Sequence, residues 1–194
     1  MEEKEMVQNL HVMFERAVPT LESMRQAFRA QNEGALTEAE KNFVEIFQSS
    51  LPLTEAVMEK KEKNDVEKKL TLLLIPLQKI AAAIMNLIGK RKRIMDGSLC
   101  FTDKAVGEVE DLFLLLEEQF VDARDFIVTG NPLLKKRIET LCSQIAEAAD
   151  HDATEHQNRL VTGLCSPRSS YYYLEIVDSF KNISRNLADL SGKL

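Results

Sequence analysis

Residues 150–156 gather five side chains that could bind a metal ion: Asp150, His151, Asp152, Glu155 and His156. If this segment is helical, residues four positions apart share a face, so Asp152 lies beside His156 and His151 beside Glu155. Imidazole nitrogens and carboxylate oxygens are zinc ligands. Helical pairs of this kind are more often surface pairs, which is the interpretation we favour, with a metal site as the alternative. No histidine has a glutamate three positions before it, so the ligand pattern of di-iron bundles is absent.

A second candidate is the basic run Lys90, Arg91, Lys92 and Arg93. Such a run could bind phosphate groups or an anionic membrane surface. Four residues are few for electrostatic anchoring, so we interpret the run as a solvated linker between two halves of the chain. No glycine-rich phosphate-binding loop is present, and nucleotide binding therefore has no support.

Composition narrows the class of protein. Hydrophobic residues make up 44% and charged residues 29% of the 194 residues, which is typical of a soluble globular chain. The net charge of −6 argues against nucleic-acid binding. The three cysteines form neither a CxxC pair nor a disulfide framework, and the N-terminus is acidic, so we expect a cytoplasmic protein. The most apolar window, residues 70–88, contains Pro76, Gln78 and Lys79, and predicts a buried core helix rather than a membrane span.

The chain is built around a heptad pattern that occurs twice. Near the C-terminus, apolar residues spaced alternately three and four apart predict one buried helix face. The same pattern stands 103 positions earlier, from Tyr173 back to Leu70, and a Gly-Lys pair follows each copy. The two sets are Leu70, Leu73, Leu77, Ile80, Ile84 and Leu87, and Tyr173, Ile176, Phe180, Ile183, Leu187 and Leu190. We infer a tandem duplication with repeats 1–93 and 94–194.

Each repeat reads as three helices, and nothing alternates with the period of a strand. The first half predicts a helix over 3–31 kinked at Pro19, a second opened by a Thr37–Glu40 capping box and interrupted near Pro52, and a third capped by Asp65 and bent at Pro76. The second half predicts helices opening at Thr102, at Asn131-Pro132 and at Ser166-Pro167, with stops at Gly130 and Gly163. The fold class is all-α: six helices as two antiparallel three-helix bundles side by side, or one six-helix bundle with pseudo-twofold symmetry.

Residues 155–190, EHQNRLVTGLCSPRSSYYYLEIVDSFKNISRNLADL, resemble the closing portion of PhoU-type phosphate-uptake regulators. They resemble still more closely the PhoU-like cytoplasmic tail of bacterial sodium–phosphate cotransporters. The family is itself two three-helix repeats, so the resemblance extends over the whole chain and is specific in its last part. The matching residues are His156, Arg159, Leu160, Gly163, Cys165, Ser166, Asp178, Asn182 and Ile183.

The resemblance also implies where a metal cluster would be bound. Family members carry a Glu-x-x-x-Asp pair in each half, and these pairs fall here at Thr71 and Ile75 and at Leu174 and Asp178. Only Asp178 is a carboxylate, and one carboxylate is too few ligands for a hard cation. We therefore expect no metal at these positions and no cofactor.

Three functions follow as expectations. The first is a non-catalytic regulatory module in phosphate uptake and homeostasis that docks on a membrane transporter or sensor. The second is the excised C-terminal cytoplasmic domain of a sodium-dependent phosphate cotransporter, and the third, least favoured, is a metal-binding protein or enzyme. The first implies a transporter or sensor as partner, a homodimer, no nucleic acid, and peripheral association with the inner face of the cytoplasmic membrane through the partner.

The last helix offers one further ionic prediction. Asp178 and Lys181 are spaced to form a local surface pair. Arg185 would instead meet a carboxylate of the fourth helix, with Glu110, Glu117 and Glu118 as candidates.

Overall fold

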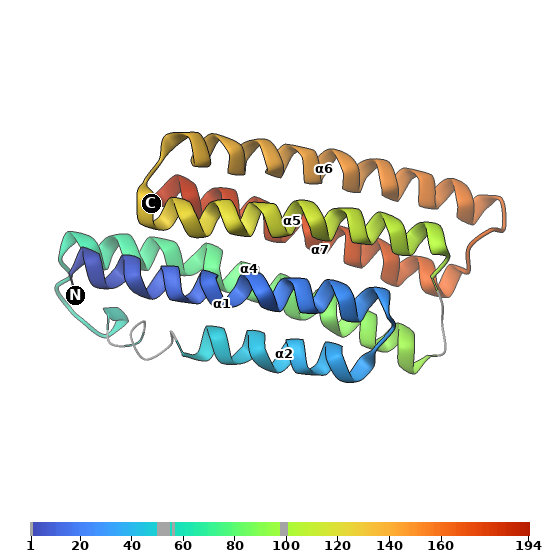
Figure 1. The fold of residues 1–194 in the computed structure, drawn as a ribbon, viewed down its shortest axis with the longest axis horizontal. Coiled ribbons are helices and arrows are strands. Elements are labelled where there is room, and N and C mark those ends of the chain that lie inside the picture. The colour runs from blue at the N-terminus through green and yellow to red at the C-terminus, as the bar shows by residue number, and fades with distance from the viewer. Residues whose placement is uncertain (1, 50–54, 56, 98–100) are drawn as a thin grey trace.

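The computed structural model describes residues 2–49, 55, 57–97 and 101–194. It is all-helical: no strand occurs in those ranges, which confirms the predicted all-α class. The structure has six long helices in those ranges, labelled in Figure 1. They are α1 (Glu3–Arg29), α2 (Glu33–Gln48), α4 (Asp65–Asp96), α5 (Asp103–Thr129), α6 (Pro132–Val161) and α7 (Pro167–Lys193).

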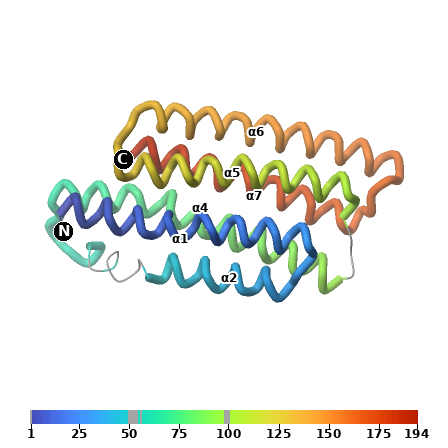
Figure 2. Tube along the Cα trace, in the orientation of Figure 1, coloured from blue at the N-terminus to red at the C-terminus, as the bar shows by residue number. Residues whose placement is uncertain are grey.

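The two halves pack on each other through their first and last helices. α1 packs against α5, and α4 makes its most extensive contacts with α7. α2 lies on α1 and α4 at one side, and α6 lies on α5 and α7 at the opposite side (Figures 1 and 2). Buried residues of all six helices belong to one continuous hydrophobic core. Among the described residues, the helix contacts therefore join the two halves around this core.

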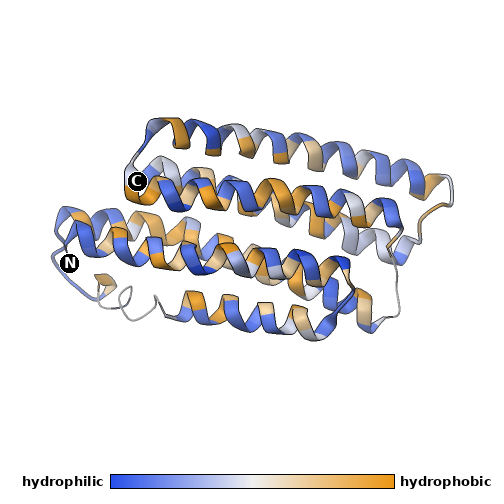
Figure 3. Cartoon of the chain, viewed as in Figure 1, coloured by the Kyte–Doolittle hydropathy of each residue, from blue (hydrophilic) through white to orange (hydrophobic). Residues whose placement is uncertain are grey.

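The twelve predicted heptad positions are buried in α4 and α7, none more than 8% exposed. Their alternation of three and four residues keeps the apolar side chains on one face of each helix. Figure 3 shows apolar and polar residues interspersed along the helices, as helices with one buried face require. Edge-to-face aromatic contacts fill the centre, such as Phe113 against Phe180 with ring centroids 4.8 Å apart. Burial of each such side chain contributes about 1.5–3 kcal/mol.

Several predicted helix ends are confirmed. Thr102 caps α5 by accepting a hydrogen bond from the Ala105 amide, and Asn131 caps α6 ahead of Pro132. Gly130 ends α5 with φ of 58°, a left-handed conformation that suits glycine. α7 starts at Pro167 after Ser166, as predicted, although the Ser166 side chain makes no capping hydrogen bond.

Two predicted starts in the first half are wrong. α2 begins at Glu33, four residues before Thr37, because the Asn32 side chain accepts a hydrogen bond from the Ala35 amide and caps the helix there. Asp65 is the first helical residue of α4 rather than its cap. The cap is Asn64, which forms a reciprocal capping box with Glu67.

The basic run is not a linker, which corrects a third prediction. α4 does not end at Gly89 but continues as a helix through Lys90–Arg93 to Asp96, beyond the Arg93 boundary assigned to the first repeat. α1 and α4 also run without interruption through Pro19 and Pro76. The predicted interruption at Pro52, and Cys100, lie outside the described residues.

Candidate functional site

A buried ionic network joins α5, α6 and α7 near one end of the second half, where α5 and α7 begin and α6 ends. Glu108 of α5 has a side chain only 3% exposed. Its two carboxylate oxygens accept hydrogen bonds from the Arg159 guanidinium at 2.8 and 2.7 Å, and the Tyr173 hydroxyl donates to the same carboxylate at 2.6 Å. A bidentate guanidinium–carboxylate pair is the geometry in which a buried charge is best compensated. Burial and the Glu108 carboxylate both raise the pKa of the Tyr173 hydroxyl, which therefore stays protonated and donates.

His156 belongs to this network and is 2% exposed. Its ring stacks on Tyr173 with centroids 4.1 Å apart, and its Nδ1 lies 3.4 Å from Arg159 Nη2 and 4.0 Å from the Cys165 sulfur. Burial, followed by the Arg159 charge, lowers the pKa of His156, so the ring is neutral near pH 7. Because a guanidinium can only donate, Nδ1 is assigned as the acceptor and Nε2 carries the proton.

The structure separates the other candidate ligands of residues 150–156. Asp152 is half-buried, and its pKa is raised by burial and then by the Glu108 charge. His151 is exposed, and Glu155 accepts a hydrogen bond from the Asn158 side chain. Asp150 pairs with Lys181 at 2.9 Å. Within the described ranges, no group of three or more His, Cys, Asp or Glu side chains is placed to hold a metal ion.

The family motif positions lie on the outer parts of α4 and α7. Thr71 donates its hydroxyl to the Glu67 carbonyl, Ile75 is 53% exposed, and Leu174 packs against the rim of the core. Asp178 accepts a hydrogen bond from Asn182 and lies 3.6 Å from Lys181, which is the predicted local pair.

The four basic residues of α4 have separate environments. Arg91 is 1% exposed, donates to the Phe28 carbonyl at 3.1 Å, and lies over the Phe28 ring. Lys90 pairs with Glu175 at 3.0 Å, and its interactions with Glu175 and Tyr171 raise its pKa against the opposing effect of burial. Lys92 pairs with Glu40, and Arg93 is exposed. The run therefore does not form one basic patch.

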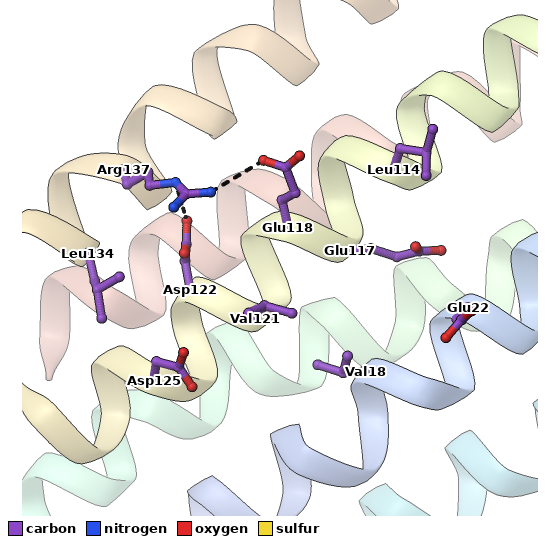
Figure 4. A pocket seen from close by; sticks show the side chains of 10 residues that line it. All are labelled: Val18, Glu22, Leu114, Glu117, Glu118, Val121, Asp122, Asp125, Leu134 and Arg137. Carbon is purple, nitrogen blue, oxygen red and sulfur yellow. Dashed lines mark hydrogen bonds and ion pairs between the residues drawn. The ribbon is translucent and has the colours of Figure 1, made fainter.

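A groove of about 580 Å³ lies between α1, α5 and α6 (Figure 4). We call it the acidic groove. Apolar side chains line part of it, and Leu114 among them is 44% exposed. It is lined by Val18, Glu22, Leu114, Glu117, Glu118, Val121, Asp122, Asp125, Leu134 and Arg137. A cavity of about 570 Å³ shares Asp125 and Leu134 with it and continues it along α1.

Carboxylates outnumber cations in the acidic groove by five to one. Figure 4 shows Arg137 of α6 between two of them, 3.1 Å from Asp122 and 3.5 Å from Glu118. Burial raises the pKa of Asp122, and the Arg137 charge opposes that effect. The groove thus combines an apolar surface with a negative potential.

The prediction for Arg185 is wrong. Its side chain is exposed and, among the described residues, donates to the Asn182 side chain at 3.5 Å rather than to a carboxylate of α5. The carboxylates proposed for it are paired with other residues: Arg25 lies 2.8 Å from Glu117, Arg29 lies 2.8 Å from Glu110, and Arg137 approaches Glu118.

Sequence reasoning found His156, Arg159 and Tyr173 but not the carboxylate that joins them. Glu108 directly precedes the buried Val109 on the inward face of α5 and carries no motif. It has the spacing of a core position, four residues before Leu112, and a charged residue at such a position is the signal that could have revealed it.

Comparison with known proteins yields no match: no family model, no curated protein and no solved structure is similar to this chain at a significant level.

Proposed function

We propose that this protein is a non-catalytic regulatory module of phosphate uptake that docks on a membrane transporter or sensor through the acidic groove. The observation that supports docking is the groove itself, a long cavity with apolar and acidic lining. The link to phosphate uptake rests on the resemblance of residues 155–190 to PhoU-type regulators.

The chemistry of the groove defines the segment that it would bind. Apolar side chains such as Leu114 and Val121 would take up the apolar face of a partner helix. The surrounding carboxylates would face Lys or Arg residues at the edges of that helix. Complementary charge speeds association and excludes acidic partners. The expected partner segment is therefore a cationic amphipathic helix, such as a cytoplasmic segment of a transporter.

The same lining favours binding over catalysis. Its polar members are carboxylates and one arginine, and no Ser, Thr, Cys, His or Lys side chain is among the ten lining residues. Asp122, Glu118 and Glu117 are each held by an arginine of a neighbouring helix. Side chains held in this way provide a fixed electrostatic surface.

The test is peptide binding by the full chain. Labelled peptides covering the cytoplasmic segments of the phosphate transporters and sensors of the same organism are titrated with the protein, and binding is followed by fluorescence anisotropy. Glu118→Lys should weaken binding of a cationic peptide by roughly tenfold or more, since a like charge inside an interface costs over 1 kcal/mol. Glu118 is 58% exposed, so its replacement should not unfold the protein.

The matched control is Glu147→Lys, on an exposed position of α6 outside the groove. It changes the net charge equally and should leave the affinity within about twofold. Equal loss in both variants, or no binding by any peptide, would refute docking in the groove. The gene sequence upstream distinguishes a free-standing regulator from a transporter tail, because a multi-span membrane region ending just before residue 1 would identify the tail.

A further inference from the structure

Four carboxylates of the acidic groove and its continuation are spaced in the repeat of a coiled coil. Glu15 and Glu22 of α1 are seven residues apart, and so are Glu118 and Asp125 of α5. Seven residues make two helical turns, so the members of each set lie on one side of their helix, about 10.5 Å apart along its axis. Glu22, Glu118 and Asp125 line the groove itself, and Glu15 lines the cavity that continues it.

α1 and α5 run in opposite directions where they form the groove. Arg25 of α1 lies 2.8 Å from Glu117, whereas Arg29, further along α1, lies 2.8 Å from Glu110, which comes earlier in α5. Figure 1 shows the same antiparallel course, with α1 and α5 packed against each other. A step toward the start of α1 is therefore a step toward the end of α5.

This register groups the carboxylates into two pairs across the groove, which we call the acidic pairs. Glu22 and Glu118 line the same cavity and form the first pair. Glu15 and Asp125 line its continuation and form the second. A hydrogen bond to Asp125 raises the pKa of Arg124, and the nearby Glu15 charge adds to this effect, as expected if Glu15 and Asp125 are close. The groove thus carries two acidic pairs one heptad apart.

An apolar floor separates the two acidic pairs. Figure 4 shows Val18 of α1 and Val121 of α5 between Glu22 on one side and Asp125 on the other. Both valines are only half-buried, so they offer apolar surface to a ligand. Each stands three or four positions, about one turn, from the carboxylates of its own helix. An apolar surface with charge on both edges is the kind of surface that an amphipathic helix recognises.

The lining also limits the length of the segment that fits. Along α1 it runs from Gln8 to Glu22, which corresponds to about 21 Å of helix. A partner helix that fills the groove is therefore about four turns, or two heptads, long. In such a helix, the residues that face the edges of the groove recur once in every seven positions.

The carboxylates at the edges can still accept a cation from a partner. Glu15 and Glu22 are both exposed, and among the described residues neither forms an ion pair. Glu118 is 58% exposed, and its contact with Arg137 is long at 3.5 Å. Each acidic pair therefore has at least one carboxylate that a lysine or arginine of a partner could approach.

We infer that the acidic groove selects a helix whose edge cations are seven positions apart and whose apolar residues lie between them. This inference rests on the proposed docking in the groove and specifies the partner. A sequence of the form K-x-x-L-x-x-x-K, extended to about two heptads, places its cations at the two acidic pairs and its leucine on the valine floor. Charges at such edge positions decide partner choice and orientation in coiled coils.

The test compares two stapled helical peptides of equal length and composition that differ only in charge spacing. In the heptad peptide the edge lysines are seven positions apart, and in the scrambled peptide they are five apart. Binding to the full chain is followed by fluorescence anisotropy. The heptad peptide should bind at least tenfold more tightly, because its lysines reach both acidic pairs, whereas a five-residue spacing turns one lysine of each set away from the groove.

Glu15→Gln tests the second acidic pair. It should weaken binding of the heptad peptide several-fold and leave the scrambled peptide unchanged, since only the heptad peptide reaches that pair. Glu15 is exposed, so the fold should be unaffected. The matched control is Glu38→Gln, at an exposed position of α2 outside the groove, which should bind both peptides like the wild type.

The outcomes separate this inference from the docking on which it rests. Equal affinity for the two peptides, with both weakened by Glu118→Lys, would refute the heptad spacing and leave groove docking intact. Affinities that Glu118→Lys does not change would refute docking in the groove, and with it the spacing. Sedimentation without peptide tests for a second copy of the chain: a dimer that Glu118→Lys dissociates would assign the groove to self-association and overturn the inference.

Discussion

Removing the Arg159 guanidinium should be among the most destabilising single changes in this protein. Arg159 neutralises Glu108, whose side chain is 3% exposed, through two hydrogen bonds of 2.8 and 2.7 Å. Arg159→Ala would leave that carboxylate buried with the Tyr173 hydroxyl at 2.6 Å and the exposed Lys104 ammonium at 3.8 Å. Breaking a buried ion pair from one side costs about 3–5 kcal/mol. For a chain of this length, that loss lowers the melting temperature by about 6–20 °C.

The assay is urea unfolding followed by far-UV circular dichroism, with the unfolding free energy compared between variants. Lys104→Ala is the matched control, because Lys104 also approaches Glu108, at 3.8 Å, but is 70% exposed. An exposed partner of this kind contributes at most about 1 kcal/mol. Tyr173→Phe removes only the hydroxyl and should cost about 1.5–3 kcal/mol, the usual contribution of a hydrogen bond to a charged group.

A combined variant distinguishes the cost of an unpaired buried charge from the cost of lost side-chain packing. Glu108→Leu, Arg159→Leu and Tyr173→Phe together replace the ionic network with apolar groups and leave no charge buried. Such replacements are often neutral or stabilising, so much of the loss in Arg159→Ala should be recovered. If Arg159→Ala alone costs less than about 1 kcal/mol, the Glu108 charge is solvated in solution and the reasoning from its burial is wrong.

Three further predictions concern stability. Arg91→Ala should lower the unfolding free energy measured in urea by about 2–4 kcal/mol, because it removes a buried hydrogen bond and a cation–π contact. A decrease below about 1 kcal/mol would mean that the Arg91 side chain is solvated in the folded protein. Gly107→Ala should raise the unfolding free energy by about 0.5–1 kcal/mol, because Gly107 lies inside α5 with open space where the Cβ would be. Gly130→Ala should lower it by about 1 kcal/mol, because Gly130 has a positive φ. Changes of the same sign in both variants would contradict this reasoning. Because the pKa of folded His156 is lowered, the unfolded chain binds more protons than the folded chain just below about pH 6.5. The unfolding free energy should therefore decrease as the pH is lowered from about 7.5 to about 5.5. His156→Phe should make this decrease smaller.

The sequence by itself determined which segments are helices and which faces are buried. The heptad positions of α4 and α7 are all in the core, and Thr102, Asn131 and Ser166 begin the helices predicted for them. These features are local, since helix periodicity and capping depend on residues a few positions apart. The errors at Thr37 and Asp65 have the same origin, because a second capping residue stood nearby and local preference could not choose between them.

The tertiary structure decided what the charged residues do. Arg91 looked like part of an exposed basic run, yet α4 continues through it and carries it against Phe28 of α1. The sequence predicts that Arg185 pairs with a carboxylate of α5, but its side chain lies exposed on the outer face of α7. The free energy of a charge depends on what surrounds it, and those neighbours come from helices far away in sequence.

Both candidate sites depend on packing in the same way. The acidic groove takes its lining from α1, α5 and α6, and the network around Glu108 takes its side chains from α5, α6 and α7. The sequence marked His156 and Ser166 through their resemblance to a known pattern, but not that two helix N-termini would meet beside them. That meeting follows from the parallel packing of α5 and α7, which no local pattern specifies because it depends on contacts between residues about 65 positions apart, such as Glu108 and Tyr173.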